Sequence, residues 1–394
     1  MHPPGAGTVL VRYGEIGVKS EQVQERMEEH LRENIETRLA GDGLDYPVER
    51  EHTRLYVYTE PQAIESVTDV VTDVFGVVSA SATRRVEPTM DAICETLAET
   101  ARECYDGGTF AVRARRAGPA GTHPFTSSDI ETDGGAAIWE ASESRGVEPE
   151  VDLDDPDVTF FVECRPDAAY VFLEKRQGPG GLPVGTQQPL VALVSGGIDS
   201  PVATWLAMKR GCPVYPLYID LGEYGGVDHR MRAVETVSRL QRFAAGTDFR
   251  LRIAPGGDGI AHISESVDHC RMVVLRRFMF RIAEHVAESL DAVGIVTGES
   301  IGQKSSQTSA NLRATSAVTS LPVHRPLLAL DKTEIIDVAR EIGTYHESTI
   351  DAGCNRIAPE QPATRPTLEV VAEHEPGDIA RLAREAAADV EIVE

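Results

Sequence analysis

The feature that most constrains the fold is a strand, a glycine-containing loop and a helix that follow one another without interruption near the middle of the chain. The apolar run LVALV leads into SGGIDS, residues 195–200, and then into PVATWLAMKRG. Two glycines flanked by hydroxyl side chains let backbone N–H groups close around an anion, and the positive end of the helix dipole favours the same charge. The loop therefore predicts a bound phosphate; the alternative is a tight turn whose glycines serve backbone geometry alone.

Strands and helices alternate regularly around this loop. Apolar segments at 190–194, 213–220 and 249–255 are typical of buried strands, and helical spacing follows at 229–245 and 271–290. The capping box Asp331-Lys-Thr-Glu334 indicates the start of another helix. This alternation is typical of an α/β fold with a doubly wound parallel sheet, covered by helices on both faces.

The N-terminal half has a different pattern, in which strands and helices suit small α+β domains with antiparallel sheets. Thr89 is the expected N-cap of a helix over 90–105. The stretch QGPGGLPVGTQQP breaks all periodicity and is expected to be a linker. Three domains are therefore predicted, over residues 1–62, 63–176 and 177–394.

Composition excludes several classes of protein. Hydrophobic residues make up 41% and charged residues 26%, which is typical of folded chains and not of disordered ones. No apolar run is long enough to span a membrane, so we expect a cytoplasmic protein without a membrane partner. The net charge of -25, with acidic residues spread over the whole length, is typical of a surface adapted to high salt. Local basic clusters therefore say more about partners than the total charge does.

Six cysteines are scattered along the chain without a CxxC pair and without metal-ligand spacing to histidine. This pattern favours a reducing compartment and one or two working thiols. The cysteines are Cys94, Cys104, Cys164, Cys212, Cys270 and Cys354.

The SGGIDS loop lacks the lysine of a Walker A loop, and it resembles the PP-loop of ATP pyrophosphatases, which adenylate a substrate and release pyrophosphate. The segments VVLRRFMFRIAE, VTGESIGQKSSQTSANL, HRPLLALDKTEII and AREIGTY together resemble the tRNA 4-thiouridine synthases, also called tRNA sulfurtransferases. LVRYGEIGVKS and RARRAGPAGTHPFTSSDIE are similar to that family's ferredoxin-like and THUMP domains. The resemblance is to the archaeal form without a rhodanese domain, and it implies a ferredoxin-like domain, a THUMP domain and a PP-loop ATP pyrophosphatase domain.

The resemblance implies ATP and Mg2+ as ligands. Asp199 would support Mg2+ and act in catalysis, and Arg276 would neutralise phosphate charge unless it belongs to an ion-paired helix face. Lys304 is a weaker phosphate candidate. The implied ATP-binding residues are Ala192, Leu193, Ser195, Gly196, Gly197, Asp199, Ser200, Leu217, Tyr218, Arg276, Gly298 and Gln307.

The family's catalytic cysteine falls on Cys354, in the segment STIDAGCNRIAP. A thiolate there would carry sulfur as a persulfide, supplied by a cysteine desulfurase or by sulfide. Cys270 is either a resolving partner of Cys354 or an ordinary helix-terminal cysteine. Some archaeal relatives carry a CxxC around the VVLRR region, but here Cys270 stands alone and precedes that position. We therefore expect no iron-sulfur cluster.

Binding of tRNA is expected from the N-terminal half, where cations cluster on two strands and an aromatic side chain could stack on an unpaired base. Phe125 is open to a second interpretation, in which it packs inward. The candidate tRNA-binding residues are Arg113, Arg115, Arg116, Phe125, Lys175 and Arg176, with Lys19 as a weaker one.

The resemblance implies adenylation of uridine 8 of tRNA followed by transfer of persulfide sulfur to form 4-thiouridine. It also implies a possible homodimer. The alternatives are sulfur transfer in thiamine synthesis, another PP-loop enzyme that modifies tRNA or forms amides, and an RNA-binding protein with a decayed nucleotide site.

Overall fold

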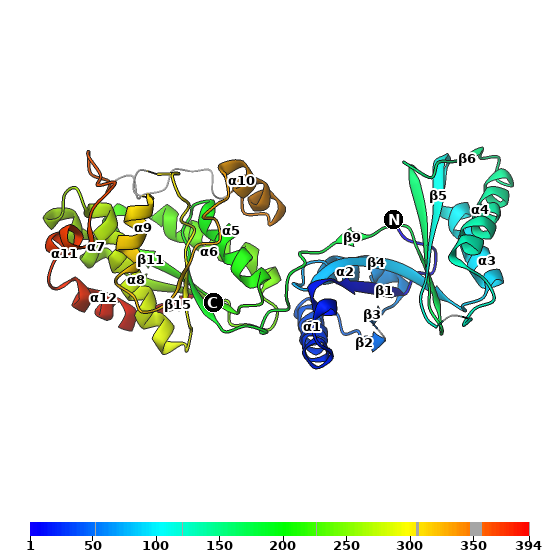
Figure 1. Cartoon of the computed structure of the whole chain (residues 1–394), viewed down its shortest axis with the longest axis horizontal. Coiled ribbons are helices and arrows are strands. Elements are labelled where there is room, and N and C mark those ends of the chain that lie inside the picture. Colours follow the sequence, from blue (N-terminus) through cyan, green and yellow to red (C-terminus); the bar gives the residue numbers. More distant parts are fainter. Residues whose placement is uncertain (52, 120, 226, 305–306, 347–356, 394) are drawn as a thin grey trace. The chain divides into compact units, whose positions relative to one another are not determined.

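The computed structural model describes residues 1–51, 53–119, 121–225, 227–304, 307–346 and 357–393 (Figure 1). The chain forms two compact units, Met1–Gly181 and Leu182–Glu394. The division between them falls within the glycine-rich and proline-rich stretch in which the sequence predicts a linker.

The described part of the first unit contains one nine-stranded sheet with the order β2-β3-β1-β4-β8-β7-β5-β6, and β9 pairs with β4. Its strands are β1 Thr8–Tyr13, β2 Val48–Glu51, β3 Arg54–Tyr58, β4 Val77–Val86, β5 Gly108–Arg116, β6 Pro149–Val151, β7 Val158–Cys164, β8 Ala169–Phe172 and β9 Arg176–Gln177. Its α-helices are α1 Glu21–Gly41, α2 Ile64–Val71, α3 Met90–Cys104 and α4 Ser127–Glu143.

Strand β4 joins two lobes of this unit, because its first part pairs with β1 and its last three residues pair with β8. Helix α2 packs on β1 and β4. A domain boundary at residue 62, as predicted from the sequence, separates α2 and β4 from β1, which both of them contact. The Thr89 hydroxyl caps α3 by accepting a hydrogen bond from the backbone N–H of Ala92, as the sequence predicts.

The second lobe corrects the expectation of a purely antiparallel sheet. Strand β5 pairs in parallel with both β6 and β7. Parallel neighbours need a crossover connection, and α4 provides it between β5 and β6. Figure 1 shows α3 and α4 along one side of β5, and their apolar side chains bury Phe110 and Val112.

A buried carboxylate connects the two lobes on the opposite face of the sheet. Glu163 of β7 is 4% exposed and forms ion pairs with Arg12 of β1 at 3.5 Å and Arg54 of β3 at 3.4 Å. Arg165 is a third partner. Burial opposes ionisation of Glu163, but Arg12 and Arg54 outweigh it and hold its pKa below the ordinary value.

Replacement of this carboxylate, Glu163→Gln, should destabilise the first unit by about 3–5 kcal/mol, because one buried and two partly buried guanidinium groups lose their common partner. Hydrogen exchange of β1 and β7, measured by mass spectrometry, should rise. The exposed ion pair of Glu29 and Arg32 provides the control, since Glu29→Gln should change stability by less than about 0.5 kcal/mol.

The pH dependence of the same variant follows from the direction of the pKa shift. A carboxylate with a lowered folded-state pKa stabilises the fold above its ordinary pKa, and this contribution is lost as the pH falls through the folded-state value. The wild type should therefore lose stability more steeply than Glu163→Gln below the ordinary glutamate pKa. Parallel acid-unfolding curves would contradict this role of Glu163.

The described part of the second unit contains a six-stranded sheet with the order β14-β13-β10-β11-β12-β15. Its strands are β10 Leu190–Leu193, β11 Val214–Asp220, β12 Leu251–Pro255, β13 Ile295–Val296, β14 Val323–His324 and β15 Glu391–Val393. Its α-helices are α5 Asp199–Lys209, α6 Val227–Leu240, α7 Gly257–Ser266, α8 Arg271–Ser289, α9 Ser309–Ser316, α10 Lys332–Glu341, α11 Leu368–His374 and α12 Ile379–Ala388.

This sheet confirms the doubly wound fold that the alternation predicts. Five strands are parallel, and β15 adds an antiparallel edge that the sequence analysis did not foresee. The chain moves from the central strand β10 to β11 and β12 on one side, and later to β13 and β14 on the other. The order of the strands therefore reverses between β10 and β13, and ligands of open α/β sheets bind at such a point.

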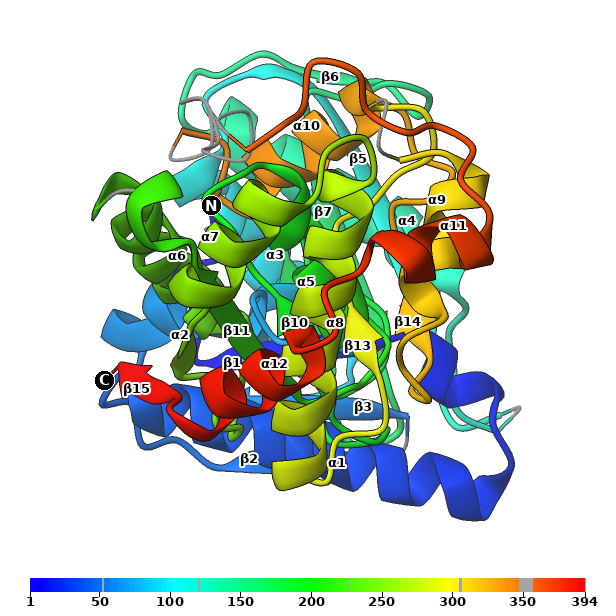
Figure 2. The same ribbon diagram turned by 90° about the vertical axis from the view of Figure 1, so that its left-hand side faces the viewer.

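Helices pack on both faces of this sheet. Helices α5 and α6 contact β11 on one face, while α8 contacts β10 and β13 and α12 contacts β12. Figure 2 shows α8 and α12 in front of β10, β11 and β13. Apolar side chains of α7, α8 and α12 form the main core with Val191, Leu217 and Ile219. The long helix α8 thus packs directly against β10 and β13.

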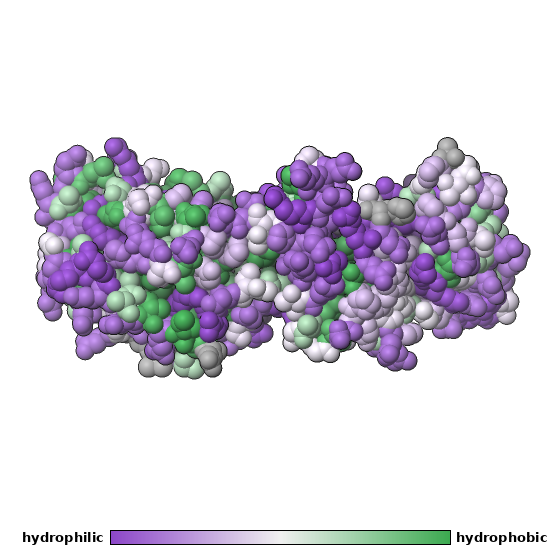
Figure 3. Space-filling view, turned by 90° about the horizontal axis from the view of Figure 1, so that it is seen from below, coloured by the Kyte–Doolittle hydropathy of each residue, from purple (hydrophilic) through white to green (hydrophobic). Residues whose placement is uncertain are grey.

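The visible surface is mostly hydrophilic, with scattered apolar residues, in Figure 3. This agrees with the composition of the chain, in which 63 acidic residues outnumber 38 basic ones. No helix in the described part of the chain has both the length and the apolar character that a membrane span requires.

Candidate active site

The glycine-containing loop leaves β10 and turns directly into α5. The backbone N–H of Ser195 donates to the Ser200 Oγ at 2.8 Å, and the N–H of Gly197 donates to the Ser195 Oγ at 3.3 Å. Ile198 is the N-cap of α5 and makes no side-chain cap. The first turn of α5 therefore keeps backbone donors for a ligand, and its dipole favours an anion there.

The backbone packs so closely at two glycines of this site that any side chain would collide with its neighbours. A Cβ on Gly196 would lie 2.8 Å from the Arg232 Cβ on α6. A Cβ on Gly298, which follows β13, would lie 2.7 Å from the backbone nitrogen of Ser200. Gly298 thus lets the end of β13 contact the start of α5, and this contact brings two separate segments to the switch point.

A cavity of about 220 Å3 opens over the loop, and ten of the twelve sequence-predicted ATP-binding residues line it. They are Leu193, Ser195, Gly196, Gly197, Asp199, Ser200, Tyr218, Arg276, Gly298 and Gln307. The other two, Ala192 and Leu217, are fully buried in β10 and β11 and do not line the cavity. The cavity brings together residues from the ends of three strands, β10, β11 and β13, and from α8.

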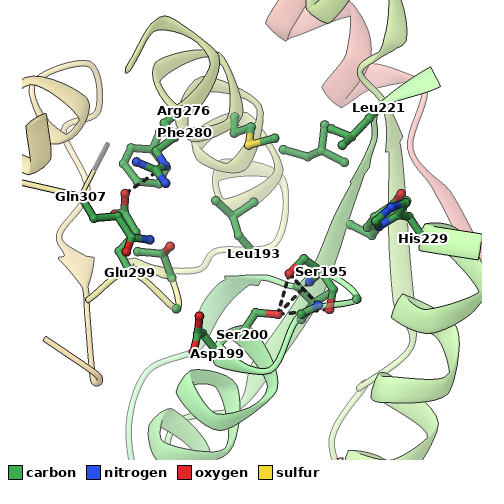
Figure 4. Close-up of a pocket in the computed structure, with 18 of the residues that line it drawn as sticks. Leu193, Ser195, Asp199, Ser200, Leu221, His229, Arg276, Phe280, Glu299 and Gln307 are labelled. Carbon is green, nitrogen blue, oxygen red and sulfur yellow. Dashed lines mark hydrogen bonds and ion pairs between the residues drawn. The ribbon is translucent and has the colours of Figure 1, made fainter. Parts of the chain in front are cut away.

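The walls of the cavity differ in chemistry. Figure 4 shows Arg276, Phe280, Glu299 and Gln307 on one side of the loop and Leu221 and His229 on the other. The Oε1 atom of Gln307 is buried and accepts no hydrogen bond from the described residues. An amino group on a ligand would satisfy this acceptor.

The sequence left two interpretations of Arg276 open, a phosphate-binding residue and a member of an ion-paired helix face, and its position fits both. It lines the cavity from α8, and its Nε lies 3.4 Å from the Glu299 Oε1. Arg325 forms the second ion pair of Glu299, at 2.9 Å. Ion pairing and a position in the cavity are therefore compatible, and Glu299 is a cavity residue that the sequence analysis did not single out.

Asp199 has a partner that the sequence analysis also missed. The Lys332 Nζ donates to the Asp199 Oδ1 at 2.8 Å, although the two residues are 133 positions apart. Lys332 is the first residue of α10, whose Asp331–Glu334 capping box the structure confirms. The loop has no Walker-type lysine of its own, and an ammonium group reaches it from a distant helix. Only the capping box marked this helix start in the sequence.

The five cysteines in the described part of the chain share one property: burial raises the pKa of each thiol. Cys164 has the largest rise, to about 11, and it is fully buried, whereas Cys94, Cys104 and Cys212 are half-buried instead of lying in the core. Cys354 lies outside the described residues. The first residue after this gap is Ile357, which is buried in the same core as Cys270.

The candidate tRNA-binding residues fall into two groups. Arg113, Arg115 and Lys175 are exposed, and the Lys175 ammonium lies 4.2 Å from the centre of the Phe161 ring. Burial lowers the pKa of Lys175, and the nearby Arg12 lowers it further. Arg113 and Arg115 alternate with the core residues of β5, so they lie on the face of the sheet away from α3 and α4. Arg113 also donates a hydrogen bond to the Leu153 carbonyl, although its side chain is exposed.

The other three candidates are buried or half-buried, and each has structural partners. Phe125 is 8% exposed and packs in the core under α3 and α4, so the inward alternative is correct and the stacking one is wrong. Arg116 donates to the Phe125 carbonyl at 2.9 Å and holds that loop. Arg176 is paired with Glu65, Asp69 and Glu174. Three neighbouring carboxylates leave little attraction for phosphate at Arg176.

The fold and the site define a class: a PP-loop nucleotide-binding domain attached to a THUMP unit. Residues 8–81 match the ThiI ferredoxin-like domain, 87–174 the THUMP domain and 185–377 the family described as thiamine biosynthesis protein (ThiI). A protein of Halobacterium salinarum named "Probable tRNA sulfurtransferase" is 54% identical over 394 residues, which cover 100% of this chain and 99% of that protein.

A protein of the same name from Methanosarcina mazei is 40% identical over 383 residues, covering 96% of this chain and 93% of that protein. The crystal structure of a 4-thiouridine synthetase in complex with RNA and with bound ATP matches with a TM-score of 0.85 and 33% identity. The match covers 99% of this chain and 100% of that one. The chain belongs to this family of tRNA sulfurtransferases.

The contact at Gly298 can be tested directly. Gly298→Ala should push the end of β13 away from α5, which lowers stability by about 1–3 kcal/mol and weakens nucleotide binding. Gly377→Ala is the matched control, because a Cβ there meets nothing within 4 Å. Thermal unfolding and calorimetric titration with ATP measure both effects. Equal behaviour of the two variants would show that the close approach at Gly298 does not shape the site.

Proposed function

We propose that this chain is an ATP-dependent tRNA sulfurtransferase, which adenylates uridine 8 of tRNA and replaces its O4 with sulfur to form 4-thiouridine. The observation that carries the proposal is the cavity over the PP-loop, which gathers the loop, Arg276 and Gln307 from distant segments. The relatives named tRNA sulfurtransferase and the solved 4-thiouridine synthetase with RNA and ATP support it.

ATP binds with its phosphates on the loop of residues 195–200 and at the first turn of α5. The adenosine lies along the ends of β10 and β11, near Leu193 and Tyr218, with the backbone of Ala192 and Leu217 beneath it. The Oε1 of Gln307 accepts a hydrogen bond from the adenine amino group, which satisfies an otherwise unpartnered buried acceptor.

Asp199 suits Mg2+, which proteins usually bind through one or two carboxylates together with substrate phosphates. The described residues contain no group of three or more metal ligands, so the phosphates would supply most of the coordination. When bound, the ion neutralises charge on the leaving pyrophosphate. Asp199 would hold that ion, and the Lys332 ammonium fixes the position of the Asp199 carboxylate.

Adenylation begins when the O4 of the target uridine attacks the α-phosphorus of ATP, and the bond to pyrophosphate breaks. Arg276, Lys304 and Lys332 stabilise the negative charge that develops on the departing pyrophosphate. The base loses its N3 proton in this step, and the product is an O4-adenylated base in which AMP is a good leaving group at C4.

Cys354 then supplies the sulfur as a persulfide. Its terminal sulfur attacks C4, AMP leaves, and the base is joined to the enzyme by a disulfide. A second thiol or an external reductant supplies two electrons to cleave this bond and release 4-thiouridine. A cysteine desulfurase restores the persulfide by passing its sulfane sulfur to the reduced Cys354 thiolate. Sulfide can restore it only by attacking a disulfide between Cys354 and the second thiol, which then leaves as a thiolate. The cycle needs no iron-sulfur cluster.

The tRNA binds through the exposed cations of the first unit, Arg113, Arg115 and Lys175, which contact backbone phosphates. Arg116 contributes by holding the loop that carries Phe125. A tRNA substrate and reduced thiols fit a cytoplasmic enzyme. A homodimer would let one subunit hold the tRNA that its partner modifies.

The first test is mass spectrometry of nucleosides from a tRNA transcript incubated at high salt with ATP, Mg2+ and the protein. Cysteine, a cysteine desulfurase and a reductant supply the sulfane sulfur, and the reductant also releases some sulfide. We expect 4-thiouridine with the wild type and with the control Cys212→Ala, and none with Asp199→Ala or with Cys354→Ala. Product from Cys354→Ala would mean that sulfide attacks C4 directly. Absence of product from the wild type would contradict the assignment of the substrate.

A second prediction concerns the distant lysine. Lys332→Ala should lower kcat/KM for ATP by about 10- to 100-fold, because a charged donor beside Asp199 is lost. Pyrophosphate release in the presence of tRNA measures the effect. Lys209→Ala is the control, since Lys209 lies over the Trp205 ring at the other end of α5. A comparable loss of kcat/KM in both variants would contradict a specific role of Lys332 in the site.

A second candidate function is sulfur transfer in thiamine synthesis, which the family description of residues 185–377 favours. Sulfur relay through Cys354 would not require ATP. It should therefore survive in Asp199→Ala, whereas formation of 4-thiouridine should not.

A further inference from the structure

Two carboxylates near α8 each bridge a pair of arginines, and only one of them faces the cavity. Glu299 lies between Arg276 and Arg325. Glu375 lies between Arg277 and Arg281, which follow Arg276 on the same helix. Glu299 lines the cavity over the PP-loop and Glu375 does not. The chain thus contains two chemically similar clusters, of which one can act on a nucleotide.

Glu299 is held more tightly by one arginine than by the other. Its Oε2 accepts from the Arg325 Nε at 2.9 Å, while its Oε1 lies 3.4 Å from the Arg276 Nε and accepts no hydrogen bond in the described part of the chain. Arg325 is itself fixed, because it donates to the Ser316 Oγ at 2.9 Å and lies over the Phe280 ring. Arg325 does not line the cavity.

The burial of Glu299 needs an explanation, since it is 4% exposed beside a loop built for anions. A carboxylate there repels phosphates and so opposes binding of ATP in the ground state. Its two guanidinium neighbours leave the cluster with one net positive charge. An acidic group that weakens binding is useful only if it improves the reaction itself, and orientation of a charged donor does so.

We propose that Glu299 is a positioning residue. Anchored by Arg325, it holds the Arg276 guanidinium toward the position where charge develops as pyrophosphate leaves. The inference rests on the adenylation proposed above, in which Arg276 contacts phosphate, and it adds two residues in defined roles: Glu299 orients Arg276, and Arg325 orients Glu299. Figure 4 shows Arg276, Glu299 and Gln307 together on one wall of the cavity.

The role predicts a split between kcat and KM. Glu299→Gln keeps the shape of the side chain and removes its charge, so kcat for pyrophosphate release should fall by about tenfold or more. The KM for ATP should stay constant or fall, because a repulsive charge is gone. Glu299→Asp keeps the charge and should recover part of kcat. Steady-state kinetics with tRNA at several ATP concentrations measures these values.

Glu375→Gln is the matched control. It removes a carboxylate that is paired with two arginines of the same helix and is 9% exposed in its side chain, but it lies outside the cavity. We expect it to lower the thermal stability and to leave kcat and KM unchanged. If both variants lose activity only in proportion to their stability, Glu299 is structural and the proposal fails.

A double-mutant cycle tests whether Glu299 acts through Arg276. In an Arg276→Ala background, Glu299→Gln should change kcat by less than about twofold, because its target is absent. An equal loss of kcat in both backgrounds would overturn the proposal.

Pyrophosphate release by the wild type shows whether the proposed function fails independently of the role of Glu299. If the wild type releases no pyrophosphate with tRNA, the substrate assignment is wrong, and the same cycle is measured on the Kd for ATP by calorimetry. Coupling of Glu299 and Arg276 by threefold or more then supports the positioning role, and additive effects contradict it.

Discussion

The close approach of the end of β13 to the start of α5 is the contact on which the site depends. Gly298 leaves only enough room for the backbone of Ser200, so the segment after β13 lies against the loop that would bind phosphate. Because the strand order reverses between β10 and β13, the two strand ends diverge toward helices on opposite faces. The cavity between them collects Glu299 and Gln307 from one side and the PP-loop from the other.

Some of the cations of this acidic chain lie where anions would bind. The chain carries a net charge of -25, yet Arg276 and Lys304 line the cavity and Lys332 reaches Asp199. On the first unit, Arg115 and Lys175 lie on the helix-free face of the sheet. A general negative field repels polyanions, so local positive charge has to provide the attraction and decides where a tRNA or ATP is held. Carboxylates such as Glu163 and Glu299 fix the direction of the guanidinium groups around them.

Much of this could be predicted from sequence because the signals are local. The PP-loop needs a strand, two glycines and a helix within about twenty residues, and all three lie in one continuous segment. The Thr89 cap and the Asp331–Glu334 capping box depend on side chains three residues from their partners. The alternation of strands and helices predicted the doubly wound sheet. In contrast, α7 starts in the glycine-rich PGGDGI, and only packing of Ile260 and Ile263 in the core makes it helical.

By itself, the sequence determined the phosphate-binding loop, the order of the elements and, through resemblance, most of the residues that line the cavity. The tertiary structure alone decided which distant groups meet: Lys332 with Asp199 across 133 positions, and Arg325 with Glu299 behind Arg276. It also decided that Phe125 is buried, that β5 pairs in parallel, and that β4 serves two lobes. The physical reason is that caps and loops are set by neighbours along the chain. Ion pairs, strand pairing and burial depend on which surfaces the core brings together.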